Sequence, residues 1–319
     1  MKHLSAAWKG MLAAFTACTI FGFSFMFSRL AYAQADRSVV LAWRFLVAVI
    51  VLDLLLLAGR LRLPGCGGFR LRLGRVPARD WGALLLLGLC EPVLYFIGES
   101  IGISRTNSSF ASVMIALIPL ASSLVAAVFL HEVPNLRQGL AAALSVAGVV
   151  VVSLVGAGQG TVTLAGVLAL LLAITAGAAY TNLSRFLSRF TPFERTYVIF
   201  SLGLVWFLGS ALLHGFSFGD IWAARRLPGF MTAVLYLGGL SSVVAYYLTN
   251  YGLSALPVAR FTVFINWTTV VSILAGVILL DEPFTWVQAA GSALILLGLW
   301  GANYFATDAG NTGVREERS

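Results

Sequence analysis

Long apolar segments follow one another along this chain, separated by short connections rich in Arg, Pro, Gly and Asp. Each segment is close to the roughly 20 residues that a helix needs to cross a bilayer. Most run too continuously to be the alternating strands of a membrane barrel. We predict ten transmembrane helices in an all-α polytopic membrane protein, over residues 10–32, 39–58, 81–102, 107–130, 136–156, 163–185, 195–214, 229–250, 258–280 and 284–305.

The composition excludes the main classes of soluble protein. Of the 319 residues, 59% are hydrophobic and 11% are charged, whereas a soluble domain carries roughly 25% charged residues. So few charges could not cover a water-facing surface. The net charge of +8 comes from basic residues in the short loops. We attribute it to membrane topology and predict no nucleic-acid partner.

The two halves of the chain resemble each other. A shift of 150 positions aligns residues 104–148 with the second half. It pairs identical residues along its length: Ser122 with Ser272, Glu132 with Glu282, Gln138 with Gln288, Gly148 with Gly298, and further upstream Gly88 with Gly238 and Gly102 with Gly252. We predict two five-helix repeats, over residues 10–156 and 163–305, between an N-terminal segment 1–9 and a hydrophilic, disordered tail 306–319.

Five spans per repeat is an odd number, so the second repeat must enter the membrane from the opposite side and the repeats are inverted. An N-terminus in the cytoplasm puts 14 basic residues on that side and five on the other. This bias predicts that both termini are cytoplasmic in a plasma (cell inner) membrane. Ala31-Tyr32-Ala33 resembles a signal-peptidase site, but the apolar run from Gly10 exceeds a signal core of roughly 7–15 residues. We therefore expect the first span to stay in the mature protein.

Each predicted repeat carries an apolar helix that ends in Leu-x-Glu, at Leu130-His131-Glu132 and at Leu280-Asp281-Glu282. The second span opens with Trp43-Arg44-Phe45. With these features the chain resembles the EamA family of the drug/metabolite transporter superfamily over residues 10–305. The resemblance implies a secondary transporter of small metabolites, often an exporter, with a central cavity between the two repeats. It does not name a substrate.

Two carboxyl groups lie within the third predicted span. Glu91 is near its middle and is followed by Pro92, which can bend the helix. Ionisable groups at this depth are costly and mark functional sites. Glu91 could carry a coupled proton or face a substrate amine; a protonated carboxyl bonded to a neighbouring helix is the structural alternative. Glu99, about 80° further round the helix, could line the same cavity.

Arg44 enters the second span near its outer end, where its guanidinium could bind a substrate carboxylate. Snorkelling to the headgroups or pairing with a helix terminus is an equal alternative. Other polar and aromatic side chains could orient a ligand or simply pack between helices. The candidates among them are Tyr95, Asn182, Tyr246, Asn250, Asn266 and Trp267.

Three acidic residues directly precede predicted helices. We interpret them as structural helix caps, because a carboxylate can bind the free amides and the positive dipole at a helix N-terminus. They are Glu132, Asp281 and Glu282. Substrate contact is the alternative. Pro283 suits the first turn of the last helix.

The chain contains no HExxH or phosphate-loop motif, and His3, His131 and His214 lie near span ends. The cysteines, Cys18, Cys66 and Cys90, have no metal-binding spacing. We therefore predict no metal, no cofactor and no enzyme activity. The function predicted is secondary active transport of small molecules across the lipid bilayer, with amino acids as the leading substrate and protons as a candidate coupling ion. A multidrug or lipid-translocating protein is the alternative.

Overall fold

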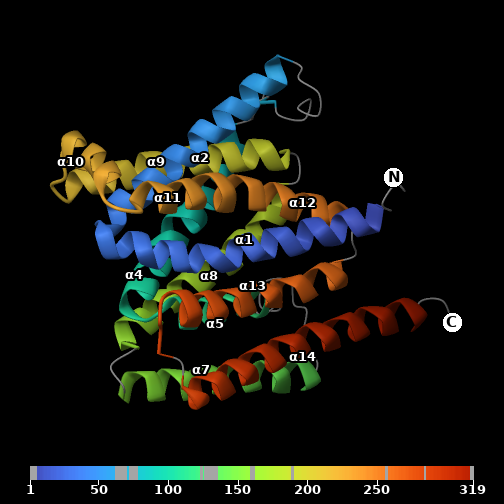
Figure 1. The fold of residues 1–319 in the computed structure, drawn as a ribbon. Helices are drawn as coiled ribbons and strands as arrows, with labels where there is room; N and C mark the ends of the chain where they lie inside the picture. The colour runs from blue at the N-terminus through green and yellow to red at the C-terminus, as the bar shows by residue number, and fades with distance from the viewer. Residues whose placement is uncertain are drawn as a thin grey trace, which may run out of the picture.

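A computed structural model describes residues 6–61, 70–71, 78–122, 125, 136–158, 162–187, 190–255, 258–283 and 285–316. Every regular element in these ranges is a helix (Figure 1). The first half contains α1 (Ala6–Gln34), α2 (Arg37–Arg60), α3 (Ala78–Gly88), η2 (Leu89–Leu94), α4 (Tyr95–Arg105), α5 (Ser108–Ile115) and α7 (Leu136–Gly158). The second half contains α8 (Leu164–Phe186), α9 (Pro192–Leu213), α10 (Phe218–Ala223), η3 (Ala224–Arg226), α11 (Phe230–Leu235), η4 (Tyr236–Val244), α12 (Ala245–Ala255), α13 (Val258–Leu279) and α14 (Trp286–Glu316).

Apart from α10 and η3, which lie in a predicted connection, the described helices coincide with the predicted apolar segments. Six of them are long and apolar enough to cross a membrane: Trp8–Gln34, Arg37–Arg60, Asp80–Arg105, Leu164–Ser184, Phe193–Leu213 and Phe230–Thr249. Shorter apolar helices occupy the other four predicted positions, at Ser108–Ser122, Gly139–Val152, Trp267–Leu279 and Trp286–Gly301. The all-helical membrane fold is thus confirmed, and the count of ten membrane crossings stays a prediction.

The end of the chain differs from the expected disordered tail. The structure continues α14 as a helix to Glu316, whereas the hydrophilic composition from residue 306 predicted no regular structure. Extending an existing helix avoids the cost of helix nucleation, because each added residue forms one hydrogen bond to a turn that is already present. Propagation from the apolar part of α14 therefore explains the helix beyond residue 305.

The third predicted span of each half is interrupted by a π-helical segment. In the first half, η2 separates α3 from α4, and Glu91 within it has an extended backbone (φ −140°, ψ 117°). Pro92 has no N–H to continue the α-helical pattern. In the second half, η4 separates α11 from α12. The two interruptions contain or adjoin Gly88 and Gly238, which the 150-residue shift had paired.

Helices of the two halves pack against each other. The contacting pairs include α2 with α9, α5 with α13, α7 with α14, α4 with α8, and α1 with both α12 and α13. The pair α7–α14 lies along the lower edge of Figure 1. Its close crossing requires glycine, because a Cβ at Gly298 would lie 2.4 Å from Ser145 Oγ. The interior of the fold is therefore built from both halves together.

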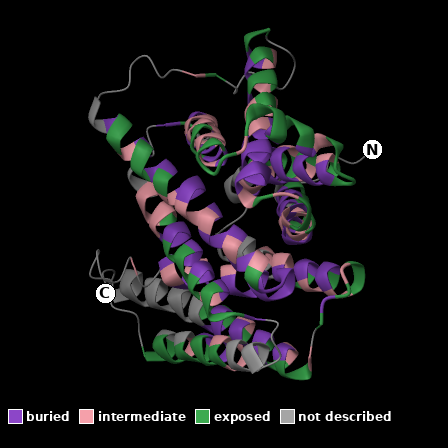
Figure 2. Cartoon of the chain, turned by 90° about the vertical axis from the view of Figure 1, so that its left-hand side faces the viewer, coloured by how far each residue is buried: buried purple, intermediate pink, exposed green. Residues whose placement is uncertain are grey.

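Many large apolar residues of the helices are exposed, and Figure 2 shows exposed residues on several of the helices. Leu54 of α2 is 61% exposed, and Ile278 of α13 is 67% exposed. An apolar surface of this extent would drive aggregation in water but is compatible with lipid. The exposed faces thus agree with a membrane protein.

Candidate transport cavity

A cavity of about 570 Å³ lies between the two halves. Helices α1, α2, α4, α8, α12 and α13 contribute to its wall, as do η4 and residues 112–122. Its aromatic lining consists of Phe21, Phe25, Tyr95, Phe96 and Tyr246. Its polar lining includes Ser24, Arg44, Glu99, Ser112, Ser122, Thr181, Ser241, Thr249, Thr268 and Thr269. A cavity of this size that combines aromatic and polar side chains is typical of a small-molecule site.

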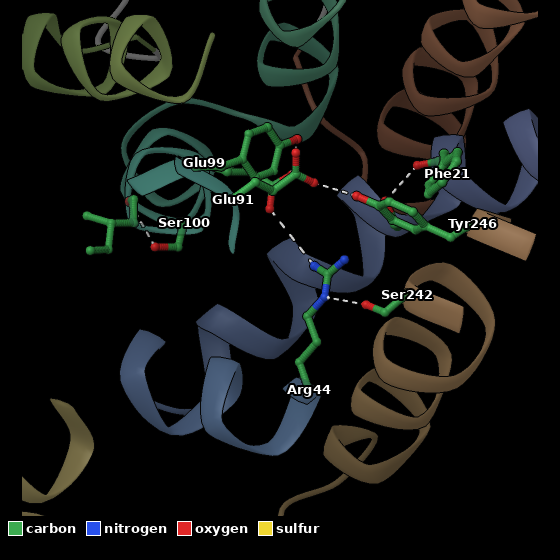
Figure 3. A network of polar contacts seen from close by, with 10 residues as sticks. Phe21, Arg44, Glu91, Glu99, Ser100, Ser242 and Tyr246 are labelled. Carbon is green, nitrogen blue, oxygen red and sulfur yellow. Dashed lines mark hydrogen bonds and ion pairs between the residues drawn. The ribbon is translucent and has the colours of Figure 1, made fainter. Parts of the chain in front are cut away.

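Arg44 and Glu99 form an ion pair at this cavity. Arg44 Nη1 lies 3.9 Å from Glu99 Oε2, and both side chains are 6% exposed. Arg44 Nε donates a hydrogen bond to Ser242 Oγ (3.2 Å), and its Cζ lies 4.3 Å from the ring centroid of Phe96. Figure 3 shows the guanidinium turned toward the carboxylates. The snorkelling alternative is therefore wrong, because these contacts hold the charge inside the protein.

Only one of the two Glu99 oxygens accepts a hydrogen bond from a described residue; the other is the oxygen that lies 3.9 Å from Arg44 Nη1. Its Oε1 accepts a hydrogen bond from the hydroxyl of Tyr95 (3.1 Å), one turn earlier on α4. Its Oε2 has no hydrogen-bond partner among the described residues. Buried polar atoms are nearly always bonded, so a carboxylate oxygen at a cavity wall can accept a hydrogen bond from a ligand.

Glu91 lies beside the cavity and is not among its described lining residues. Tyr246, which does line the cavity, donates a hydrogen bond from its hydroxyl to Glu91 Oε1 (Figure 3). This bond joins η2 of the first half to α12 of the second. Groups of three or more His, Cys, Asp or Glu side chains that could hold a metal ion are absent from the described residues.

The other predicted ligand-orienting residues have different positions. Asn182 donates from Nδ2 to Ser122 Oγ (2.9 Å) and Ser122 O (3.1 Å). Trp267 donates from Nε1 to Thr19 Oγ1 (3.0 Å). Both bonds join neighbouring helices, and neither residue is among the described lining residues. Asn250 and Asn266 belong to α12 and α13, but their side chains lie outside the described part of the chain.

Glu282 caps a helix other than the predicted one. Its Oε1 accepts hydrogen bonds from Ser108 N and Oγ (both 2.8 Å), and its Oε2 accepts from Ser109 N (3.1 Å) and Oγ (2.8 Å). These donors form the N-terminus of α5 in the first half. The expectation that Glu282 caps the following helix is therefore wrong.

The loop geometry explains this difference. The amides of Leu280 and Glu282 both donate to Gly276 O and so fold the loop back onto α13. Asp281 within this turn is exposed and has a positive φ of 50°. The helix α14 begins at Trp286, where Thr285 N donates to Gln288 Oε1 (2.9 Å) and Gln288 N to Thr285 Oγ1 (3.3 Å). Glu132 lies outside the described residues.

Sequence reasoning missed three hydroxyl residues at the site: Ser241, Ser242 and Thr249. Ser241 and Thr249 line the cavity, and Ser242 binds Arg44. The internal repeat contained a signal for two of them. The 150-residue shift places Glu91 on Ser241 and Glu99 on Thr249, so these two carboxylates of the third span have hydroxyls at the matching positions of the second half.

Comparisons with known proteins agree with the architecture. The profile of the EamA-like transporter family matches residues 8–154 and 163–304. The chain is 32% identical to "Uncharacterized transporter YcxC" of Bacillus subtilis (strain 168) over 297 residues, covering 92% of each protein. It is 26% identical to the "Probable terminal-alkyne amino-acid exporter" of Streptantibioticus cattleyicolor over 227 residues, which cover 70% of this chain and 74% of that protein.

A solved structure shares the fold. A crystal structure with 22% sequence identity superposes with a TM-score of 0.63, covering 94% of this chain and 98% of that one. The family profile covers nearly the whole chain in two segments, and the relative YcxC is similar over almost its full length. The chain therefore belongs to the EamA-like transporter family.

Proposed function

We propose that this protein is a secondary active transporter that exports small metabolites, with amino acids as the leading substrates. The observation that carries the proposal is a central, mostly apolar cavity whose wall holds both a guanidinium and a carboxylate. An α-amino acid carries the two complementary charges. Arg44 would bind its carboxylate, and Glu99 its amine. The relative named as an amino-acid exporter supports this substrate class.

The mechanism we propose is alternating access between two inverted repeats, residues 10–156 and 163–305. We take ten membrane crossings from the apolar segments of the sequence and a cytoplasmic location of both termini, in a plasma membrane, from the charge bias of the loops. The packing of helices across the two halves supports a shared cavity that opens to either side as the repeats move. On this proposal the protein is not an enzyme and uses no cofactor.

Counterflow in proteoliposomes tests the function. Vesicles holding the purified protein are preloaded in turn with amino acids, nucleosides and cationic drugs, and uptake of the labelled solute is measured. We expect saturable exchange for amino acids, because their charges match Arg44 and Glu99. Exchange of cationic drugs alone would favour the multidrug alternative. Movement of labelled lipid between leaflets, with no solute exchange, would contradict the proposal in favour of lipid translocation.

We further propose that Glu91 carries a coupled proton. Its carboxyl lies apart from the cavity lining but is connected to it through the Tyr246 hydroxyl. Replacing Glu91 with glutamine is expected to abolish transport driven by a pH gradient, because the amide cannot release a proton. Counterflow, which needs no net proton movement, is expected to persist. Both rates are measured in the same proteoliposomes.

Asp53→Asn provides the matched control for this substitution. Asp53 is an exposed carboxyl on α2 that accepts a hydrogen bond from the hydroxyl of Tyr197 (2.7 Å) and does not line the described cavity. Its replacement is expected to leave pH-driven transport unchanged. An unchanged pH dependence in Glu91→Gln would reject the proton-carrying role.

A further inference from the structure

Three oxygen atoms in the cavity wall have no hydrogen-bond partner in the described part of the chain. They are Glu99 Oε2, Ser241 Oγ and Thr249 Oγ1. They come from α4, η4 and α12 and therefore from both halves of the protein. Buried polar atoms are rarely left without a partner unless a ligand or another bound group uses them.

Other hydroxyl groups of the same cavity already donate hydrogen bonds to backbone carbonyl oxygens. Ser24 donates to Phe21 O (2.7 Å), Ser112 to Ser109 O (2.8 Å) and Thr181 to Gly177 O (2.8 Å). Each of these bonds stays within one helix, which is the ordinary state of a serine or threonine in a membrane helix. Ser241 and Thr249 differ from them because they line the same cavity while their hydroxyl oxygens are buried and make no hydrogen bond to a described residue.

We propose that Glu99, Ser241 and Thr249 form the site for the ammonium group of the substrate. An ammonium group has three N–H donors and no acceptor, and the three oxygens supply three acceptors and one negative charge. Arg44, which pairs with Glu99 in this structure, would exchange that partner for the substrate carboxylate. Glu91 is not needed for this role, because its carboxyl is bound by Tyr246 and lies outside the described lining.

The aromatic part of the cavity wall determines which substrate side chains are favoured. Phe21, Phe25 and Phe96 line the cavity beside the polar group. They favour an apolar or aromatic side chain over a charged one, since a second charge would lose its hydration without a partner. The substrates assigned by this site are apolar and aromatic α-amino acids and related primary amines. This inference rests on the proposed function and makes its substrate class specific.

The test compares an amino acid with its deaminated analogue. L-leucine and 4-methyl-2-oxopentanoate share the same apolar body and carboxylate, but only leucine has an amine. Binding to the purified protein in detergent is measured as the ligand-dependent rise in the unfolding temperature, and counterflow is measured in proteoliposomes. The wild type is expected to prefer leucine in both assays.

Ser241→Ala and Thr249→Val are each expected to raise the half-saturating concentration of leucine about tenfold, because each removes one hydrogen bond to a charged group. The value for 4-methyl-2-oxopentanoate is expected to stay the same. Ser201→Ala and Thr175→Val are the matched controls. They delete hydroxyls that are bonded to their own helices and lie outside the described cavity lining, and they are expected to leave the preference for leucine unchanged.

The outcomes separate this inference from the proposed function. Equal recognition of leucine and 4-methyl-2-oxopentanoate by the wild type would overturn the ammonium site, as would variants that weaken both ligands equally. Leucine-selective binding that Ser241→Ala and Thr249→Val weaken, without any counterflow, would support the site and contradict transport. Counterflow of leucine that neither variant changes would support transport and overturn the site.

Discussion

Replacing Arg44 with methionine is expected to lower the rate of amino-acid counterflow by about a hundredfold. The substitution keeps a long side chain next to Phe96 but removes the cation that lies 3.9 Å from Glu99. Breaking a buried charge pair leaves the other charge uncompensated and costs about 3–5 kcal/mol. The substrate carboxylate would also lose its proposed partner. Transport in proteoliposomes and chemical unfolding in detergent measure the two effects separately.

A second substitution distinguishes the loss of function from the loss of stability. In the double variant Arg44→Met/Glu99→Gln neither charge is present, so stability is expected to recover while transport stays low. Arg225→Met is the matched control, because Arg225 also lies over an aromatic ring, 4.5 Å from the centroid of Trp222, but is only partly buried and does not line the described cavity. Wild-type transport by Arg44→Met would contradict the assignment of Arg44 to the substrate.

Much of the fold was predictable because the membrane imposes a simple rule on sequence. Every backbone polar group in lipid must be bonded within its own helix, so apolar segments of about 20 residues specify helices. The six long apolar helices and the four shorter ones all lie at predicted positions. The interruption at Glu91 and Pro92 was also visible, since proline cannot continue the hydrogen-bond pattern. The matching interruption at η4 has no proline and gave no such signal.

The candidate site was predictable in its residue types but not in its connections. Arg44, Glu91 and Glu99 stand out because charges are rare in apolar helices. Their hydroxyl partners do not, since serine and threonine are ordinary residues of membrane helices. Arg44 and Ser242 are 198 positions apart, and periodicity within one helix cannot show which distant helix will face it. Asn182 illustrates the opposite case, because its polar group serves helix packing.

The second large effect is expected at Glu282, which joins the two halves of the protein. Asn107 accepts a hydrogen bond from Phe110 N, and Glu282 accepts the amides of Ser108 and Ser109, so the first free N–H groups of α5 are bonded. In Glu282→Gln one carboxylate oxygen becomes an NH₂ group. This group cannot accept the hydrogen bond from the backbone N–H that it faces, so that donor is left without a partner. We expect the free energy of unfolding in detergent to fall by about 3 kcal/mol.

Gly276 provides an independent test of the same contact. A Cβ at Gly276 would lie 2.4 Å from both Glu282 Oε2 and Ser109 Oγ, so Gly276→Ala is expected to destabilise the protein by displacing this carboxylate. The penalty should shrink in a Glu282→Ala background, because the displaced group is then absent. Asp281→Asn is the control: Asp281 is exposed, and asparagine tolerates its positive φ. Equal penalties for Gly276→Ala in both backgrounds would show that Glu282 does not hold the two halves together.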